Sequence, residues 1–178
     1  MFLIKINKQK IMKINEVLLN EFKDEMKTTR KFYESISEDF LEFRAHKKSQ
    51  SVVELINHTL PIPSWAGVIA QNPELDWAKV TPPPVINSKE EILKQFDANV
   101  VLGIKALEET NNDQLLEAWT MKNSDADKVF FAGNKLTAIR RYVLNHTIHH
   151  RAQLGVYLRL NDVKVPGSYV QSADDMLY

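Results

Sequence analysis

The sequence of 178 residues contains no cysteine. This absence excludes disulfide bonds, thiolate ligands for a metal and a cysteine nucleophile, and it is compatible with the reducing cytoplasm, where we expect the protein to be. Glycine is also scarce, with only five residues, whereas leucine, lysine, glutamate, alanine and isoleucine are abundant. This composition favours helices over an all-β fold.

An excess of charge of one sign and long apolar runs are also missing. Lysine plus arginine number 23 and aspartate plus glutamate number 23, so no excess of cations indicates a nucleic-acid partner. No segment approaches about 18 consecutive apolar residues, so we expect no membrane span. The apolar start over residues 1–6 is too short for a secretory signal. We expect an N-terminal tail over residues 1–12 and a single domain over residues 13–178.

Helical periodicity is the main structural signal of the chain. Apolar residues recur at helical spacing over residues of about 13–36, 51–60, 88–110 and 134–160. Ser51 with Glu54, and Ser88 with Glu91, have the spacing of capping boxes. Residues 114–133 contain short apolar runs that fit strands or helical turns equally. Four long helical segments with long connections predict an all-α fold, a four-helix bundle with long crossover connections.

Prolines divide the chain at two places. Pro61 and Pro63 should kink or end the second helix near Leu60, because an interior proline removes a hydrogen bond and clashes with the preceding turn. Residues 64–70 then resume a helical pattern. Residues 72–84 include four more prolines and predict a linker.

Three histidines are the candidate ligands of a metal ion. His146 and His150 are four residues apart in the last predicted helix, so they share one face and can direct nitrogens at one divalent cation. The apolar stripe of that helix places at least His150 toward the core. His58, in the second predicted helix, would complete a site that keeps one coordination position open, as catalytic sites do. The alternative is that these are ordinary hydrogen-bonded histidines.

Neighbouring polar residues limit the chemistry of such a site. No glutamate follows His146, so the motif of the zinc proteases is absent. His149 points about 100° away from His150 on a helix, which predicts a surface or supporting position. His46 stands in a basic segment and is expected to be solvated. Glu54 is either an acceptor that orients an imidazole or simply the capping residue of its helix.

Several blocks of the sequence resemble one known family. These blocks are Ser51–His58, His146–Leu154, Tyr157–Arg159, Pro166–Tyr169 and Ser172–Asp175. With them the chain resembles the DinB/YfiT-like superfamily over residues of about 13–178. The resemblance implies a four-helix bundle of DinB/YfiT-like type, often a homodimer, that holds nickel or zinc on residues matching His58, His146 and His150. One departure is Val170-Gln171, where members usually have Gly-Pro.

The sequence leaves two main functions open. The first is a metal-dependent enzyme, either a hydrolase or, as the resemblance implies, a thiol-dependent transferase with a small-molecule substrate and a low-molecular-weight thiol. The second is a non-catalytic, stress-related dimer that binds a metal or another ligand; a bundle without metal is a third alternative. No catalytic residue beyond the metal is predicted. Arg151, Gln153, Tyr157 and Tyr169 are candidate polar helpers or structural residues.

Overall fold

The computed structural model describes residues 13–175, so the predicted tail over residues 1–12 lies outside the described part. The elements are α1 (Ile14–Glu34), η1 (Glu38–Phe40), α2 (Val52–Thr59), η2 (Ile62–Ser64), α3 (Trp65–Gln71), β1 (Glu74–Asp76), η3 (Trp77–Lys79), α4 (Lys89–Glu109), α5 (Asn112–Leu116), β2 (Ala118–Asn123), β3 (Lys128–Asn134), α6 (Lys135–Ile139), the π-helical turn η4 (Arg140–Asn145) and α7 (His146–Leu160).

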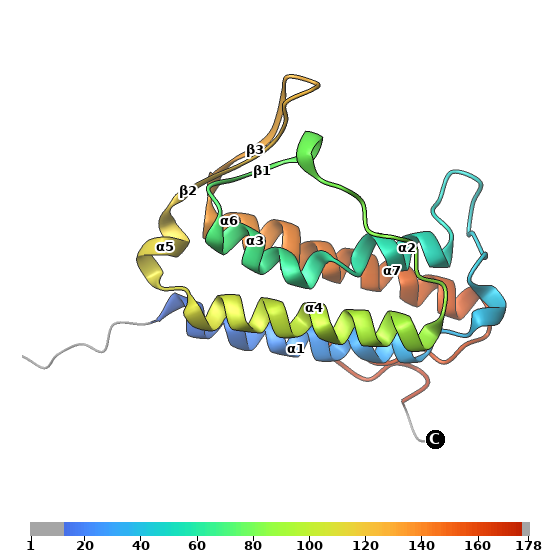
Figure 1. The fold of residues 1–178 in the computed structure, drawn as a ribbon. Coiled ribbons are helices and arrows are strands. Elements are labelled where there is room, and N and C mark those ends of the chain that lie inside the picture. Colours follow the sequence, from blue (N-terminus) through green and yellow to red (C-terminus); the bar gives the residue numbers. More distant parts are fainter. Residues whose placement is uncertain (1–12, 176–178) are drawn as a thin grey trace, which may run out of the picture.

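The helices pack around one apolar core (Figure 1). Helix α1 lies between α4 and α7, while α2 packs against α7 and α3 packs against α4 and α6. The largest fully buried side chains include Phe22, Met26, Ile56, Phe96 and Leu107. The prediction of a mostly helical fold is therefore confirmed. Among the described residues, no helix combines the length and the apolar character needed to cross a membrane.

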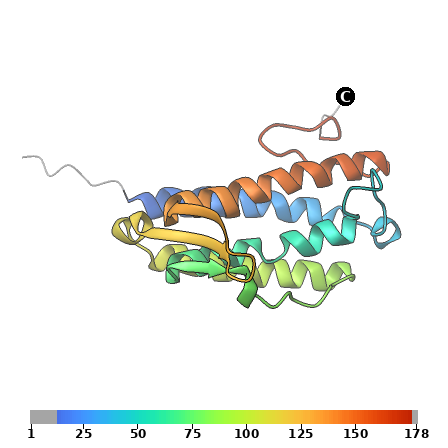
Figure 2. The ribbon, with the colours of Figure 1, turned by 90° about the horizontal axis from the view of Figure 1, so that it is seen from above.

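A small sheet corrects the prediction of an all-α protein. Strand β2 pairs in parallel with β1 and antiparallel with β3, in the order β1-β2-β3. The sheet lies beside α3 and α6 at one end of the helices (Figures 1 and 2). In β2, Trp119 and Met121 alternate with more exposed residues and are buried, which is strand periodicity. The undecided residues 114–133 thus form the end of α5 and nearly all of the hairpin of β2 and β3.

Both predicted N-cap residues precede their helices, but only one of the two predicted capping boxes forms. The Ser51 hydroxyl accepts from the Glu54 amide, and the Glu54 carboxylate accepts from the Ser51 amide, so this capping box forms. Ser88 holds the corresponding position before α4, but its side chain accepts no hydrogen bond there. The predicted start of this helix after Ser88 is therefore confirmed, whereas its predicted capping box does not form. Instead, the Lys89 amide donates to the carboxylate of Glu38 at 3.1 Å.

The predicted proline break is confirmed and is held in place by α4. Helix α2 ends at Thr59, and Pro61 precedes the short turn η2 that leads into α3, whereas Pro63 lies within it. The Leu60 carbonyl accepts a hydrogen bond of 2.7 Å from the buried side-chain amide of Asn99. A Cβ on Gly103 would lie 2.5 Å from the Pro63 carbonyl oxygen, so only glycine lets α4 approach this closely. The break that follows His58 is thus a fixed feature.

Candidate metal centre

The structure brings the three predicted histidines together. His58 stands in the last turn of α2, whereas His146 and His150 occupy successive turns at the start of α7. Each ring offers a nitrogen, and these nitrogens all lie within 4.8 Å of one another. The Nε2 atoms of His58 and His146 are 3.1 Å apart. His58 is exposed, while His146 and His150 are partly buried, so the group faces solvent on one side.

A π-helical turn directly precedes His146. Residues Arg140–Asn145 form this turn, and within it Val143 and Leu144 are buried. A π turn inserts one residue into a helix and rotates the next turns about the axis, so it sets which face α7 presents to α2. Such turns are rare and frequently occur at functional sites. The sequence periodicity did not reveal this turn.

Burial keeps the three imidazoles neutral. The pKa of His146 is lowered to about 4, chiefly by burial and then by the neighbouring rings of His150 and His58. Burial also lowers the pKa of His58 and of His150. At neutral pH each ring therefore keeps an unprotonated nitrogen, which is the form that coordinates a cation. The nitrogen arrangement and its charge state both fit a divalent metal.

A chain of hydrogen bonds fixes which nitrogen of His150 is unprotonated. The Gln50 backbone carbonyl can only accept, so the Tyr157 hydroxyl donates to it at 3.2 Å. The Gln153 amide then donates to the Tyr157 oxygen at 3.3 Å. The remaining amide oxygen of Gln153 lies 3.1 Å from His150 Nδ1 and can only accept. His150 therefore carries its proton on Nδ1, and the lone pair of Nε2 is free for a cation.

Removal of this acceptor is expected to weaken metal binding. Gln153→Leu should raise the dissociation constant of zinc about 10- to 100-fold, the usual effect of losing a group that orients a ligand. Tyr157→Phe should have a smaller effect, because Gln153 can still accept from His150. Competition with a chromophoric chelator measures both constants. Equal zinc affinity for wild type and Gln153→Leu would contradict the role of Gln153.

The shifted pKa of His146 predicts acid sensitivity of the metal-free protein. Its pKa is about 4 in the folded chain, against about 6.5 in an unfolded chain. As the pH falls below about 6.5 the unfolded state takes up the proton first, so stability present above that pH is lost progressively down to about pH 4. Urea unfolding between these values should show a smaller loss for His146→Gln than for wild type. Identical pH profiles would contradict the shift.

The other predicted neighbours do not belong to the group of three nitrogens. Glu54 completes the capping box of α2 and forms an ion pair of 2.6 Å with Arg44, so it does not orient an imidazole. His149 is exposed, with its ring centroid 4.8 Å from that of His150. The Nδ1 atom of His46 accepts from the Lys48 amide at 3.1 Å in an exposed loop.

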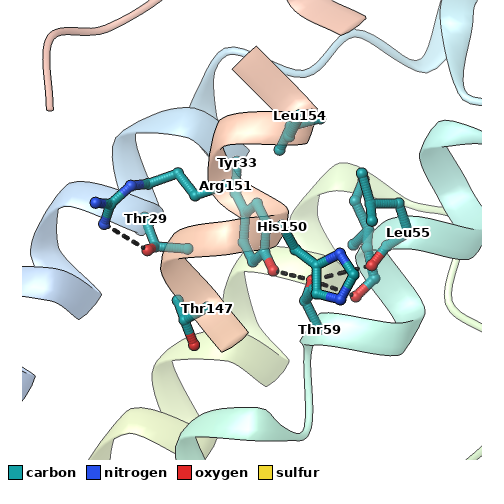
Figure 3. A pocket seen from close by; sticks show the side chains of 9 residues that line it. Thr29, Tyr33, Leu55, Thr59, Thr147, His150, Arg151 and Leu154 are labelled. Atoms are coloured by element: carbon teal, nitrogen blue, oxygen red, sulfur yellow. Dashed lines mark hydrogen bonds between the residues drawn. The ribbon is translucent and has the colours of Figure 1, made fainter. Parts of the chain in front are cut away.

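Arg151 belongs to a buried ion pair between α7 and α1. Its guanidinium donates to the Glu25 carboxylate at 2.6 Å and to the Thr29 hydroxyl at 3.2 Å. The Tyr169 hydroxyl bridges the pair, because it accepts from Arg151 and donates to Glu25. Figure 3 shows Arg151 directed toward Thr29 and away from His150. Arg151 and Tyr169 therefore join α7, α1 and the C-terminal segment, and do not act at the histidines.

A cavity of about 10 Å³ lies behind His150 (Figure 3). Its lining includes His150, Thr147, Thr59 and Tyr33, and the buried Thr147 hydroxyl has no hydrogen-bond partner among residues 13–175. This volume is close to the minimum that a single water molecule needs. A substrate therefore cannot reach the histidines from the core. The exposed side of His58 is the side from which a ligand can approach.

Comparison with known proteins identifies the family to which this chain belongs. The chain matches the DinB family over residues 8–176 and belongs to it. A DinB-like protein from Bacillus cereus ATCC 10987 is similar in structure, with a TM-score of 0.66, 18% identity and coverage of 88% of this chain and 98% of that chain. A DinB-like protein from Bacillus subtilis is similar with a TM-score of 0.64 and 21% identity, and the match covers 88% of this chain and 99% of that chain. Both likenesses concern the fold, and no curated protein matches the chain.

Proposed function

We propose that this DinB-family protein binds one divalent metal ion, zinc or nickel, at His58, His146 and His150, and that the metal activates a small nucleophile. The observation that supports this most directly is that nitrogens of three neutral imidazoles from two helices lie within 4.8 Å of one another. Three histidines form a known catalytic ligand set for zinc, with a further position left for water or substrate.

Residues around the site orient the histidine ligands and leave one side open to a small molecule. The hydrogen bond with Gln153 presents His150 Nε2, and the break after α2 fixes His58. A bound divalent cation would supply stabilisation of the anionic form of a thiol or a water molecule. The half-open position of the group, with an exposed His58, would let a small molecule reach it. We propose a thiol-dependent transferase or a hydrolase, acting in the cytoplasm as a homodimer with a low-molecular-weight thiol and a small-molecule substrate.

The test is a comparison of metal-loaded wild type with His150→Ala. Protein purified without a histidine tag is loaded with zinc or nickel, and its metal content is measured. It is then assayed with small thiols and soluble electrophiles, and separately with hydrolysable esters. We expect one metal ion per chain and a rate that depends on His150. Equal reaction rates for wild type and His150→Ala would contradict the proposal.

A second function is favoured by the narrow space behind His150. Because that cavity measures only about 10 Å³, the core side offers no room for a substrate. A non-catalytic metal-binding protein needs no such room. This alternative predicts stoichiometric metal without acceleration of thiol transfer or hydrolysis, whereas the enzyme predicts both metal and acceleration.

A further inference from the structure

Two tryptophans form a row of rings that begins beside the histidine cluster. The ring centroid of Trp65 lies 6.2 Å from that of His146, with an interplanar angle of 50°. The Trp77 ring follows at 5.5 Å from Trp65, at an angle of 65°. Both tryptophans are only partly buried, although they pack against the core. An aromatic surface therefore begins beside one of the three histidines and leads away from it.

Trp65 is placed by the proline break. It is the first residue of α3, directly after the turn η2 that Pro61 precedes and that contains Pro63. The side-chain amide of Asn99 holds this break by its hydrogen bond to the Leu60 carbonyl. The same feature that ends the helix of His58 therefore also sets the position of Trp65.

Trp77 is placed by the small sheet. It begins η3 directly after β1, and Asp76 caps that turn. One buried carboxylate oxygen of Asp76 accepts from the Ala78 amide at 3.2 Å and from the Ser124 amide at 3.0 Å. This joins the linker to the tip of the hairpin. The sheet that the sequence did not predict thus fixes the outer tryptophan.

The chemistry of this pair favours an apolar ring as its ligand. Indole faces bind aromatic and aliphatic groups through burial and through edge or offset stacking. Within residues 13–175, neither the Trp65 nor the Trp77 indole N–H donates a hydrogen bond, and neither is buried without a partner as the Trp119 N–H is. Both donors therefore remain open to solvent or ligand. A cationic group is disfavoured, because a divalent cation at the three histidines would repel it.

We infer that Trp65 and Trp77 form a subsite for the apolar, aromatic part of a ligand whose reacting atom lies at the three histidines. The inference rests on the proposed function, since it assigns the substrate class of that same site. It predicts that the site prefers a thiol with an aromatic substituent over a small polar thiol. Burial of one ring against two indoles corresponds to a preference of about tenfold or more.

The experiment uses the full chain loaded with cobalt(II), whose absorption reports ligand binding without turnover. Benzyl mercaptan and 2-mercaptoethanol are titrated, and the ratio of their dissociation constants is the readout. Wild type should bind benzyl mercaptan at least about tenfold more tightly. Trp77→Ala and Trp65→Leu should reduce this preference below about threefold, chiefly through weaker binding of benzyl mercaptan. Phe130→Ala, on the opposite edge strand β3, is the control and should keep the preference.

A second measurement needs no substitution and so does not depend on the folding of a variant. In wild type, 4-nitrobenzyl mercaptan should quench tryptophan fluorescence saturably, at the same concentrations that change the cobalt spectrum. Two outcomes would overturn the subsite alone. In the first, the cobalt and 2-mercaptoethanol spectra are normal but the wild type shows no preference for the benzyl thiol. In the second, both tryptophan variants keep the preference. Absence of any cobalt spectrum at the histidines would overturn the proposed function and the subsite together.

Discussion

Arg151→Met is expected to destabilise the protein by about 3–5 kcal/mol, the usual effect of removing one partner of a buried ion pair. Only 3% of Arg151 and 7% of Glu25 is exposed. The substitution leaves the Glu25 carboxylate in the core without its cation, and Tyr169 alone cannot neutralise it. Desolvation of that charge accounts for most of the expected loss of stability, because the methionine fills most of the space of the arginine.

Arg159→Met is the matched control, since it makes the same change on the same helix. Arg159 pairs with Asp174 at 2.6 Å, but 51% of its side chain is exposed. An exposed pair contributes only about 0–1 kcal/mol. The double substitution Glu25→Leu with Arg151→Met should recover most of the loss, because no charge then remains buried. Urea unfolding measures all four proteins, and a loss below about 1 kcal/mol for Arg151→Met would contradict the argument.

The histidine cluster could be predicted because its signals are local. His146 and His150 share a helix face through their spacing alone, and His58 was the remaining histidine in an amphipathic segment. Gln153 had only been considered as a candidate helper. Its role depends on the Gln50 carbonyl, which is distant in sequence, so no local pattern could reveal the direction of the hydrogen-bond chain.

The sheet could not be predicted because its strand pairing is not local in sequence. Strand β1 has only three residues, and its partner β2 begins more than forty residues later. Pairing over such a separation leaves no periodicity in either segment. The short alternation around Trp119 and Met121 was visible, but it did not exclude a helical turn. The position of Trp77 depends on this pairing, so the aromatic surface beside the histidines could not be predicted either.

His146→Ala is expected to weaken zinc binding by more than about 100-fold, because loss of a ligand exceeds the 10- to 100-fold loss of a group that only orients one. His149→Ala is the matched control on the same turn of helix. His149 is exposed and does not belong to the group of three nitrogens, so its removal should change affinity less than about threefold. Chelator competition at pH 7 measures both variants.

Thermodynamic linkage gives an independent measure of the same loss. Zinc at about 1,000 times the wild-type dissociation constant should raise the free energy of unfolding by about 4 kcal/mol. At the same zinc concentration, a 100-fold weaker His146→Ala site leaves only about 1.4 kcal/mol of this stabilisation. His149→Ala should keep nearly all of it. If zinc stabilises His146→Ala and wild type equally, the cation is held elsewhere, and the convergence of His58, His146 and His150 does not make a metal site.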